Sequence, residues 1–176
     1  MRSQHPSAFR RNYFIGSVGE ANSATLNNYV ARQTEKHPMA DDRVTARLTA
    51  LQFHDPAVSI AEERVGNYGK FVYGLQVVVE NAGGWNEIRD EVLTASREMI
   101  VRASTAKGWR LERIGLLSNH IHVLFGCTVT ESPEGVALSL LNNLAHSQGM
   151  SPAFRFSYYV GTVGRYDRNA IRRRVE

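Results

Sequence analysis

Four segments between residues 71 and 163 have the composition of β-strands, because they are apolar and rich in β-branched and aromatic residues. The pattern places these strands at 71–79, 109–117, 120–127 and 154–163. A turn at Asn81-Ala82-Gly83-Gly84 follows the first strand. Residues 116–118 join the second and third strands, either as a tight turn or within one bent strand.

Two helical patterns separate these strands. The first covers 85–107 and stops at Gly108, and the second begins at Glu131-Ser132-Pro133 and ends near Gly149. Their apolar residues recur at helical spacing, at Ile88, Val92, Leu93, Met99, Ile100 and Ala103 and then at Val136, Ala137, Leu140, Leu141 and Leu144. The order β-α-β-β-α-β predicts an α+β protein with a ferredoxin-like split antiparallel sheet. Its two helices would cover one face of the sheet and leave the other face free for function.

The chain also contains an internal repeat. Residues 8–19 read AFRRNYFIGSVG and residues 153–164 read AFRFSYYVGTVG, so seven of twelve positions are identical. Each copy predicts a strand that ends at glycine and is followed by a helix. The first helix is capped by Asn22 or Ser23 and has Leu26 and Val30 as its apolar stripe; the second, from about Asp167, has Ile171 and Val175 at the same spacing.

The pattern between the first copy and residue 71 is weaker. A short helix is predicted at 43–51, His54-Asp55-Pro56 breaks it, and 57–70 reads as a loop. We therefore expect three parts: an N-terminal strand–helix arm at 1–37, a linker or arm at 38–70, and the ferredoxin-like domain at 71–176.

Composition narrows the class of protein. Apolar residues make up 43% and charged residues 22% of the 176, as in an ordinary globular protein. No apolar run approaches the roughly 20 residues of a membrane span, and the N-terminus lacks a signal-peptide core. The single cysteine, Cys127, excludes a disulfide within the chain and a cysteine-based zinc site. These features lead us to expect a protein of the reducing cytoplasm.

The net charge of +4 is compatible with nucleic-acid binding but does not require it. Arginines gather near both ends of the chain, at Arg10, Arg11, Arg172, Arg173 and Arg174. They form either a solvated surface or a set of contacts to phosphates.

Two residue pairs could carry chemistry. His120 and His122 point to the same face of the strand 120–127, because side chains alternate along a strand. Such a pair is either satisfied by hydrogen bonds or binds a divalent metal, for which neutral histidine is the commonest nitrogen ligand. Tyr29 and Gln33 lie four residues apart and so share one face of the first helix. Taken alone, they read as an exposed tyrosine beside a solvated glutamine.

Together these features resemble the tyrosine transposases of the HUH single-strand endonuclease superfamily, including those associated with insertion sequences and palindromic repeats. The resemblance rests on the His120-Ile121-His122 strand, the Tyr29-x-x-x-Gln33 helix and the β-α-β-β-α-β order, and it covers residues 8–33 and 71–176. It implies that Tyr29 is the nucleophile of a 5′-phosphotyrosine intermediate. It also implies that His120, His122 and Gln33 bind Mg²⁺ or Mn²⁺, which polarises the scissile phosphate.

The same resemblance implies a single-stranded DNA partner with a hairpin, a homodimer whose tyrosine helix can serve the partner's site, and a nucleoid-associated place in a bacterial or archaeal cytoplasm. One feature departs from the family pattern, in which the tyrosine helix follows the last strand. Here Arg174 aligns with Tyr29, and Tyr166 is too near the start of its helix to match.

Two accounts of this permuted order are open. In the first, the N-terminal helix docks beside the histidines, in the same chain or in a partner, and the protein is a DNA transposase. In the second, the protein binds DNA hairpins without cutting them. A third reading, a ferredoxin-like RNA-binding module, would need exposed aromatic residues on the free sheet face, and we expect that face to carry the histidines instead.

Overall fold

The computed structural model describes residues 13–67, 69–82, 86–149, 154–167, 169 and 173. Its helices are α1 (Ser23–Ala31), α2 (Gln33–Lys36), α3 (Asp42–Leu51), α4 (Asp90–Lys107) and α5 (Pro133–Ser147). Its strands are β1 (Tyr13–Gly16), β2 (Phe53–His54), β3 (Arg64–Val65), β4 (Gly69–Val72), β5 (Gly74–Asn81), β6 (Arg110–Leu116), β7 (His120–Gly126) and β8 (Phe154–Val163). None of the helices in this described part is long and apolar enough to cross a membrane.

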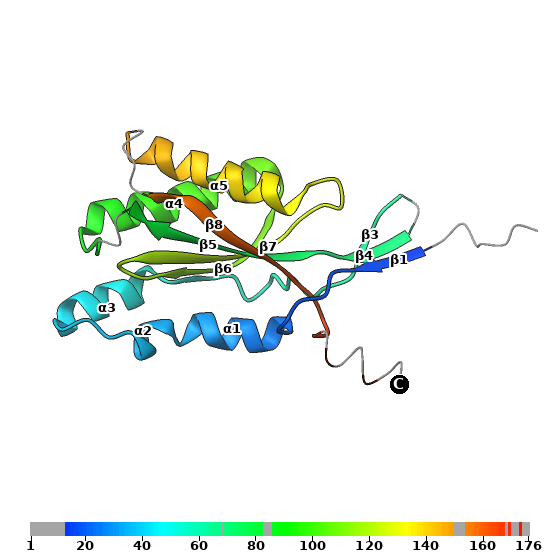
Figure 1. The fold of residues 1–176 in the computed structure, drawn as a ribbon, viewed down its shortest axis with the longest axis horizontal. Helices are drawn as coiled ribbons and strands as arrows, with labels where there is room; N and C mark the ends of the chain where they lie inside the picture. Colours follow the sequence, from blue (N-terminus) through cyan, green and yellow to red (C-terminus); the bar gives the residue numbers. More distant parts are fainter. Residues whose placement is uncertain are drawn as a thin grey trace, which may run out of the picture.

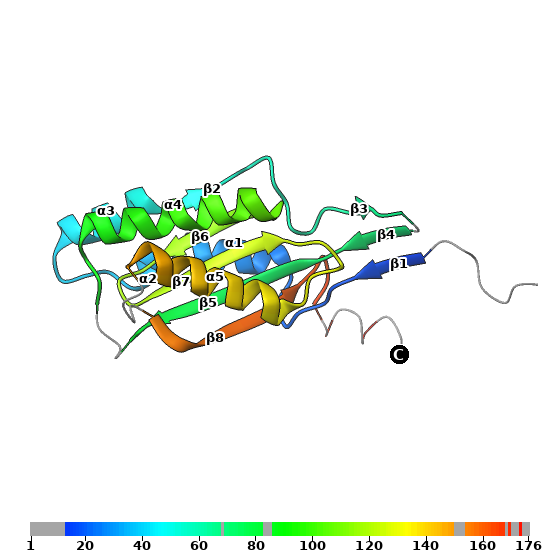
Figure 2. The same cartoon turned by 90° about the horizontal axis from the view of Figure 1, so that it is seen from above.

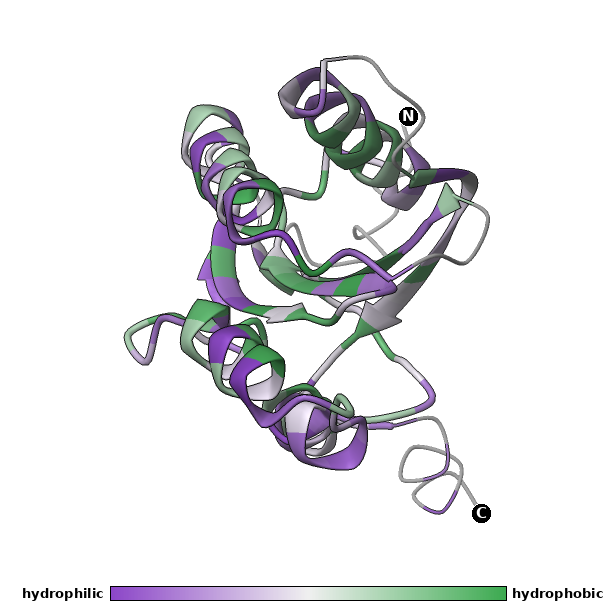
Figure 3. Cartoon of the chain, turned by 90° about the vertical axis from the view of Figure 1, so that its left-hand side faces the viewer, coloured by the Kyte–Doolittle hydropathy of each residue, from purple (hydrophilic) through white to green (hydrophobic). Residues whose placement is uncertain are grey.

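The main sheet has five strands in the order β2-β6-β7-β5-β8, and every neighbouring pair is antiparallel. The units β5-α4-β6 and β7-α5-β8 form the split β-α-β-β-α-β arrangement, which confirms the fold class predicted from the sequence. Helices α4 and α5 cover one face of this sheet, and α1 lies against the opposite face (Figures 1 and 3). The N-terminal strand–helix segment therefore occupies the face that the two long helices leave open.

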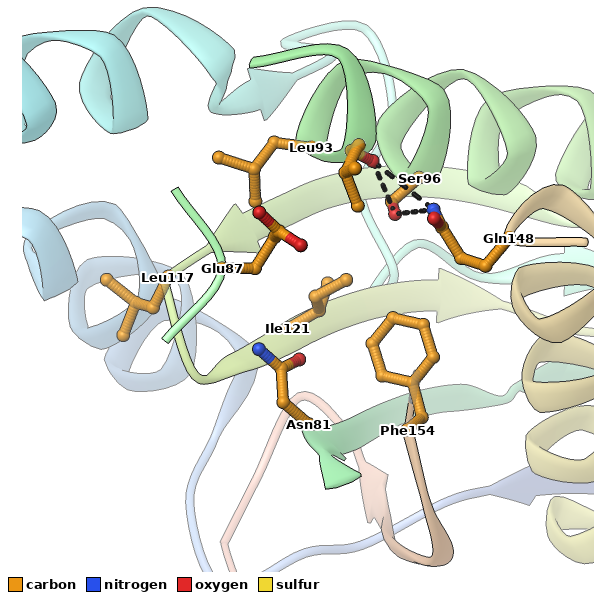
Figure 4. Close-up of a pocket in the computed structure, with 9 residues that line it drawn as sticks. Asn81, Glu87, Leu93, Ser96, Leu117, Ile121, Gln148 and Phe154 are labelled. Atoms are coloured by element: carbon orange, nitrogen blue, oxygen red, sulfur yellow. Dashed lines mark hydrogen bonds between the residues drawn. The ribbon is translucent and has the colours of Figure 1, made fainter. Parts of the chain in front are cut away.

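Alternation along β7 separates two clusters of apolar side chains. Ile121, Val123 and Phe125 pack with α4 and α5 in the larger cluster, while Leu124 packs with Leu26 and Val30 of α1 in the smaller one. His122 has the same parity as Leu124 and so lies on the α1 side of the sheet. The larger cluster encloses a space of about 20 Å³ lined by residues that include Glu87, Ser96 and Gln148, which is room for a single water (Figure 4).

The two copies of the repeat meet in the fold, and their contacts are reciprocal. Ser17 Oγ donates to the carbonyl of Val163, and Thr162 Oγ1 donates to the carbonyl of Val18 at 2.6 Å. Ser17 and Thr162 are equivalent positions of the two copies, as are Val18 and Val163. Each copy therefore makes the same contact to the other, as the two subunits of a two-fold dimer do.

Two parallel bridges repeat this symmetry, since Gly19 pairs with Asp167 and Asn22 pairs with Gly164. The backbones come so close that a Cβ on Gly164 would lie 1.8 Å from the carbonyl oxygen of Ser17. The carbonyl of Gly164 also accepts a hydrogen bond from the backbone N–H of Ser23, at the start of α1. The end of β8 thus fixes the place where α1 begins. We call this set of contacts the repeat junction.

Several elements differ from the sequence prediction. The helix expected from residue 85 begins at Asp90, because the backbone N–H of Glu87 donates to the carbonyl of Ser118 and holds residues 86–89 against the β6–β7 hairpin. In the segment 38–70 the helix predicted at 43–51 forms as α3, with Leu48 buried in the larger apolar cluster, but the short strands β2 and β3 were not predicted. The helix expected after Asp167 falls largely outside the described residues. Figure 2 shows β1, β3 and β4 extending beyond the main sheet as a small separate sheet.

Candidate active site

The two histidines lie side by side on β7, with their ring centroids 4.9 Å apart. His122 pairs with Val78 of β5 on one side and with Gly115 of β6 on the other, so it sits near the middle of the sheet. Burial, and then the charges of His120 and His37, lower the pKa of His122 to about 3. Its imidazole is therefore neutral at neutral pH, which is the form that binds metals.

Each histidine is oriented by an amide side chain at its Nδ1 atom. Asn119 Oδ1 lies 2.7 Å from His120 Nδ1, so this nitrogen carries the proton and leaves the Nε2 lone pair of His120 for a ligand. Gln76 Nε2 lies 3.0 Å from His122 Nδ1. If the Gln76 amide is turned by 180°, its oxygen accepts a hydrogen bond from the Nδ1–H of His122. The Nε2 lone pair of His122 is then free to bind a metal.

Helix α1 brings Tyr29 to this pair within the same chain. The centroid of the Tyr29 ring lies 5.9 Å from that of His122, in an edge-on arrangement. Tyr29 is 40% exposed, and the Nζ atom of Lys36 lies 5.1 Å from its ring centroid. The phenol is therefore near the histidines, accessible from solvent and close to a positive charge.

Gln33 lies deeper in the same place, at the start of α2. The chain leaves the helical conformation at Arg32, so Tyr29 and Gln33 stand on two successive helices and not on the single helix that the sequence predicted. It is 1% exposed, and neither Oε1 nor Nε2 of its amide has a hydrogen-bond partner. Its Oε1 would lie 2.8 Å from a Cβ on Gly115, the residue that pairs with His122. A buried amide with both polar atoms unsatisfied costs on the order of 1–3 kcal/mol per group, so it calls for a missing partner.

These residues fit a divalent cation. Two neutral imidazoles and an amide oxygen converge on one region, and phosphate oxygens and water would complete the coordination shell. Among the described residues, no group of three or more His, Cys, Asp and Glu side chains could hold a metal ion. The Gln33 amide is therefore a candidate for a third protein ligand beside the two histidines.

Helix α1 is held to the sheet by a buried carboxylate. Glu112 accepts hydrogen bonds from Asn27 Nδ2 on α1, at 2.9 Å, and from the backbone N–H of Ile60, at 3.0 Å. Arg113 Nε donates to Asn27 Oδ1 at 2.9 Å. The register of β6 against β7 shifts between Leu111 and Arg113, and this irregularity lets both Glu112 and Arg113 reach the helix.

One residue near the site was missed by the sequence analysis. His37 follows α2, and its ring centroid lies 6.5 Å from that of His120. Its spacing of four residues after Gln33 was the available signal in the sequence. Of the predicted DNA-binding arginines, Arg173 is exposed and donates from Nε to the carbonyl of Asn169, while Arg10, Arg11, Arg172 and Arg174 lie outside the described residues.

Comparison with known proteins gives a likeness of fold. No family model matches the sequence, and no curated protein matches it. The crystal structure of a candidate transposase from Deinococcus radiodurans R1 aligns with a TM-score of 0.51 and 17% identity, over 65% of this chain and 95% of that one. This chain shares that fold. The structure of a REP-associated tyrosine transposase bound to a REP hairpin aligns with a TM-score of 0.45 and 10% identity. That alignment covers 58% of this chain and 62% of the other chain.

Proposed function

We propose that this protein cleaves and rejoins single-stranded DNA through a covalent bond between Tyr29 and a 5′-phosphate. The observation that carries the proposal is the meeting of four side chains from distant parts of the sequence. Tyr29 contacts His122, and the unpartnered amide of Gln33 faces the same strand pair.

Under this proposal His120, His122 and Gln33 hold Mg²⁺ or Mn²⁺. The bound cation would offset the phosphate charge and stabilise the transition state. The histidines are prepared for this role by their neutral state and by the amides at their Nδ1 atoms.

The chain's own residues carry the bond changes. The Tyr29 hydroxyl gives its proton to water as its oxygen attacks phosphorus, the bond from phosphorus to the 3′-oxygen breaks, and the leaving 3′-oxygen takes a proton from water, so no net proton is gained or lost. Lys36, whose Nζ lies 5.1 Å from the centroid of the Tyr29 ring, would place a positive charge beside the bound phosphate. The phosphodiester is exchanged for a phosphotyrosine bond, so a 3′-hydroxyl can attack it in turn and rejoin a strand. This chemistry suits strand transfer.

We propose that the site is completed within one chain. The repeat junction and the Asn27–Glu112 hydrogen bond hold α1 against its own sheet. The homodimer implied by the family resemblance is then not needed for the chemistry. Mixing a Tyr29→Phe protein with a His122→Ala protein tests this, because neither alone can form the covalent product. No product is expected from the mixture, and its appearance would show that the helix acts on a partner.

We propose a DNA strand bearing a hairpin as the substrate, on the strength of the family resemblance. The deciding experiment incubates the protein with such an oligonucleotide and Mg²⁺ or Mn²⁺ and then denatures it. A DNA–protein adduct should form, disappear with a chelator and in Tyr29→Phe, and persist in Tyr166→Phe. An adduct that persists in Tyr29→Phe refutes the nucleophile. Salt-sensitive binding without any adduct would favour the alternative function, a silent hairpin-binding protein.

A further inference from the structure

The sheet face that carries the histidines continues past α1 onto β5 and β8. Along β8, Arg155, Tyr159 and Gly161 share this face, while Tyr158 and Val160 pack against the larger apolar cluster beneath. Tyr159 is 55% exposed. Its exposed ring offers a flat surface on which a nucleic-acid base can stack.

Tyr159 lies in the same cross-strand row as His122. It pairs with Val78 of β5, and Val78 pairs with His122 of β7. Neighbouring strands are about 4.8 Å apart, so the two strand spacings place the backbone of Tyr159 about 10 Å from that of His122. At about 3.4 Å per nucleotide of a stacked strand, that distance corresponds to about three nucleotides.

The ring of Tyr159 lies over Gly161, its neighbour on the same face. A Cβ on Gly161 would meet the Tyr159 hydroxyl at 2.6 Å and ring carbons at 3.1 and 3.2 Å. Glycine at this position therefore allows the ring to rest against the strand. One side of the ring faces the backbone, and the side turned away from the sheet is open for a flat partner.

We infer that Tyr159 is a stacking platform for one base of the DNA strand, about three nucleotides from the phosphate at the histidines. The inference rests on the proposed function, since it takes the strand bound at the histidines to continue over the same face. Stacking on an aromatic ring accepts any base, because every base has a π-face.

The test measures binding of a fluorescent hairpin-bearing oligonucleotide to the full chain with Tyr29→Phe, which binds without reacting. Adding Tyr159→Ala should weaken binding about 5- to 100-fold, and Tyr159→Phe should keep it within about twofold of the parent. Leu138→Ala, which removes an exposed apolar side chain from α5, is the control and should bind as the parent does. The salt dependence should be the same in all four proteins, because no phosphate contact is lost.

A second set of measurements uses oligonucleotides that each lack one base, at successive positions near the cleaved bond. One position should weaken binding of the parent and have little further effect in Tyr159→Ala, because both changes remove the same stack. Parent-like affinity of Tyr159→Ala, or equal losses in Tyr159→Ala and Tyr159→Phe, would overturn the platform. Adduct formation by the unaltered protein is scored separately, so a failure of the proposed cleavage is distinguished from a failure of this inference.

Discussion

Replacing Gly115 with alanine tests how closely α1 must approach the histidines. Gly115 of β6 pairs with His122, and α1 passes directly over it. A Cβ at this position would lie 2.6 Å from Val30 Cγ1 and 2.8 Å from Gln33 Oε1. Ordinary contacts begin at 3.4 Å, so the nearer contact requires α1 to move outward by 0.8 Å (3.4 − 2.6).

That movement should damage the reaction more than the fold. Val30 of α1 and Gln33 of α2 are each 1% exposed, so neither side chain can turn away into solvent and both helices must shift. Overpacking of this kind costs about 1–3 kcal/mol of folding free energy. A misplacement of about 1 Å between reacting groups costs about 100-fold in rate. We therefore expect a folded protein whose adduct formation is slower by about 10- to 100-fold.

The assay is a single-turnover time course of the Tyr29–DNA adduct, with a thermal unfolding curve for each protein. Gly126→Ala is the matched control, because its Cβ would meet nothing nearer than Arg110 Cβ at 3.5 Å. It should react at the parent rate. A Gly115→Ala protein that is folded and equally fast would refute the close approach of α1 as the basis of the site.

Three further predictions concern the groups around this helix. Gly164→Ala should force the two turns of the repeat junction apart, lowering the unfolding temperature and abolishing the adduct; an unchanged adduct would show that the junction does not position α1. Gln76→Leu should weaken Mn²⁺ binding about 10- to 100-fold in calorimetry, because it removes the partner of His122 Nδ1, whereas unchanged affinity would exclude this role. With a chelator present to remove metal ions, the free energy of unfolding should fall as the pH drops from about 6.5 towards 3. His122 is protonated in the unfolded chain over this range, while burial keeps its pKa in the folded protein at about 3. Urea unfolding curves measured at several pH values should show a weaker pH dependence of the unfolding free energy in His122→Ala. An unchanged pH dependence would show that other groups cause it.

The sequence by itself determined four of the five strands of the main sheet and the face on which its histidines lie; the fifth strand, β2, was not predicted. Strand and helix signals are local, because they depend on apolar spacing and on turn residues a few positions away. The strand expected at 154–163 forms with those bounds, and His122 lies opposite Ile121 and Val123 as alternation requires. Nothing beyond the pleat of a strand is needed for that result.

Tertiary contacts decided the rest. Gln33 is buried only because α1 docks over Gly115, and α1 docks there because the end of β8 meets the first repeat at Gly164. Local spacing predicts that Tyr29 and Gln33 share a helix face, but it does not predict which strand this face packs against. The start of α4 and the approach of His37 to His120 depend likewise on residues distant in the chain. Contacts of this kind follow from the packing of whole elements, which no short window of sequence contains.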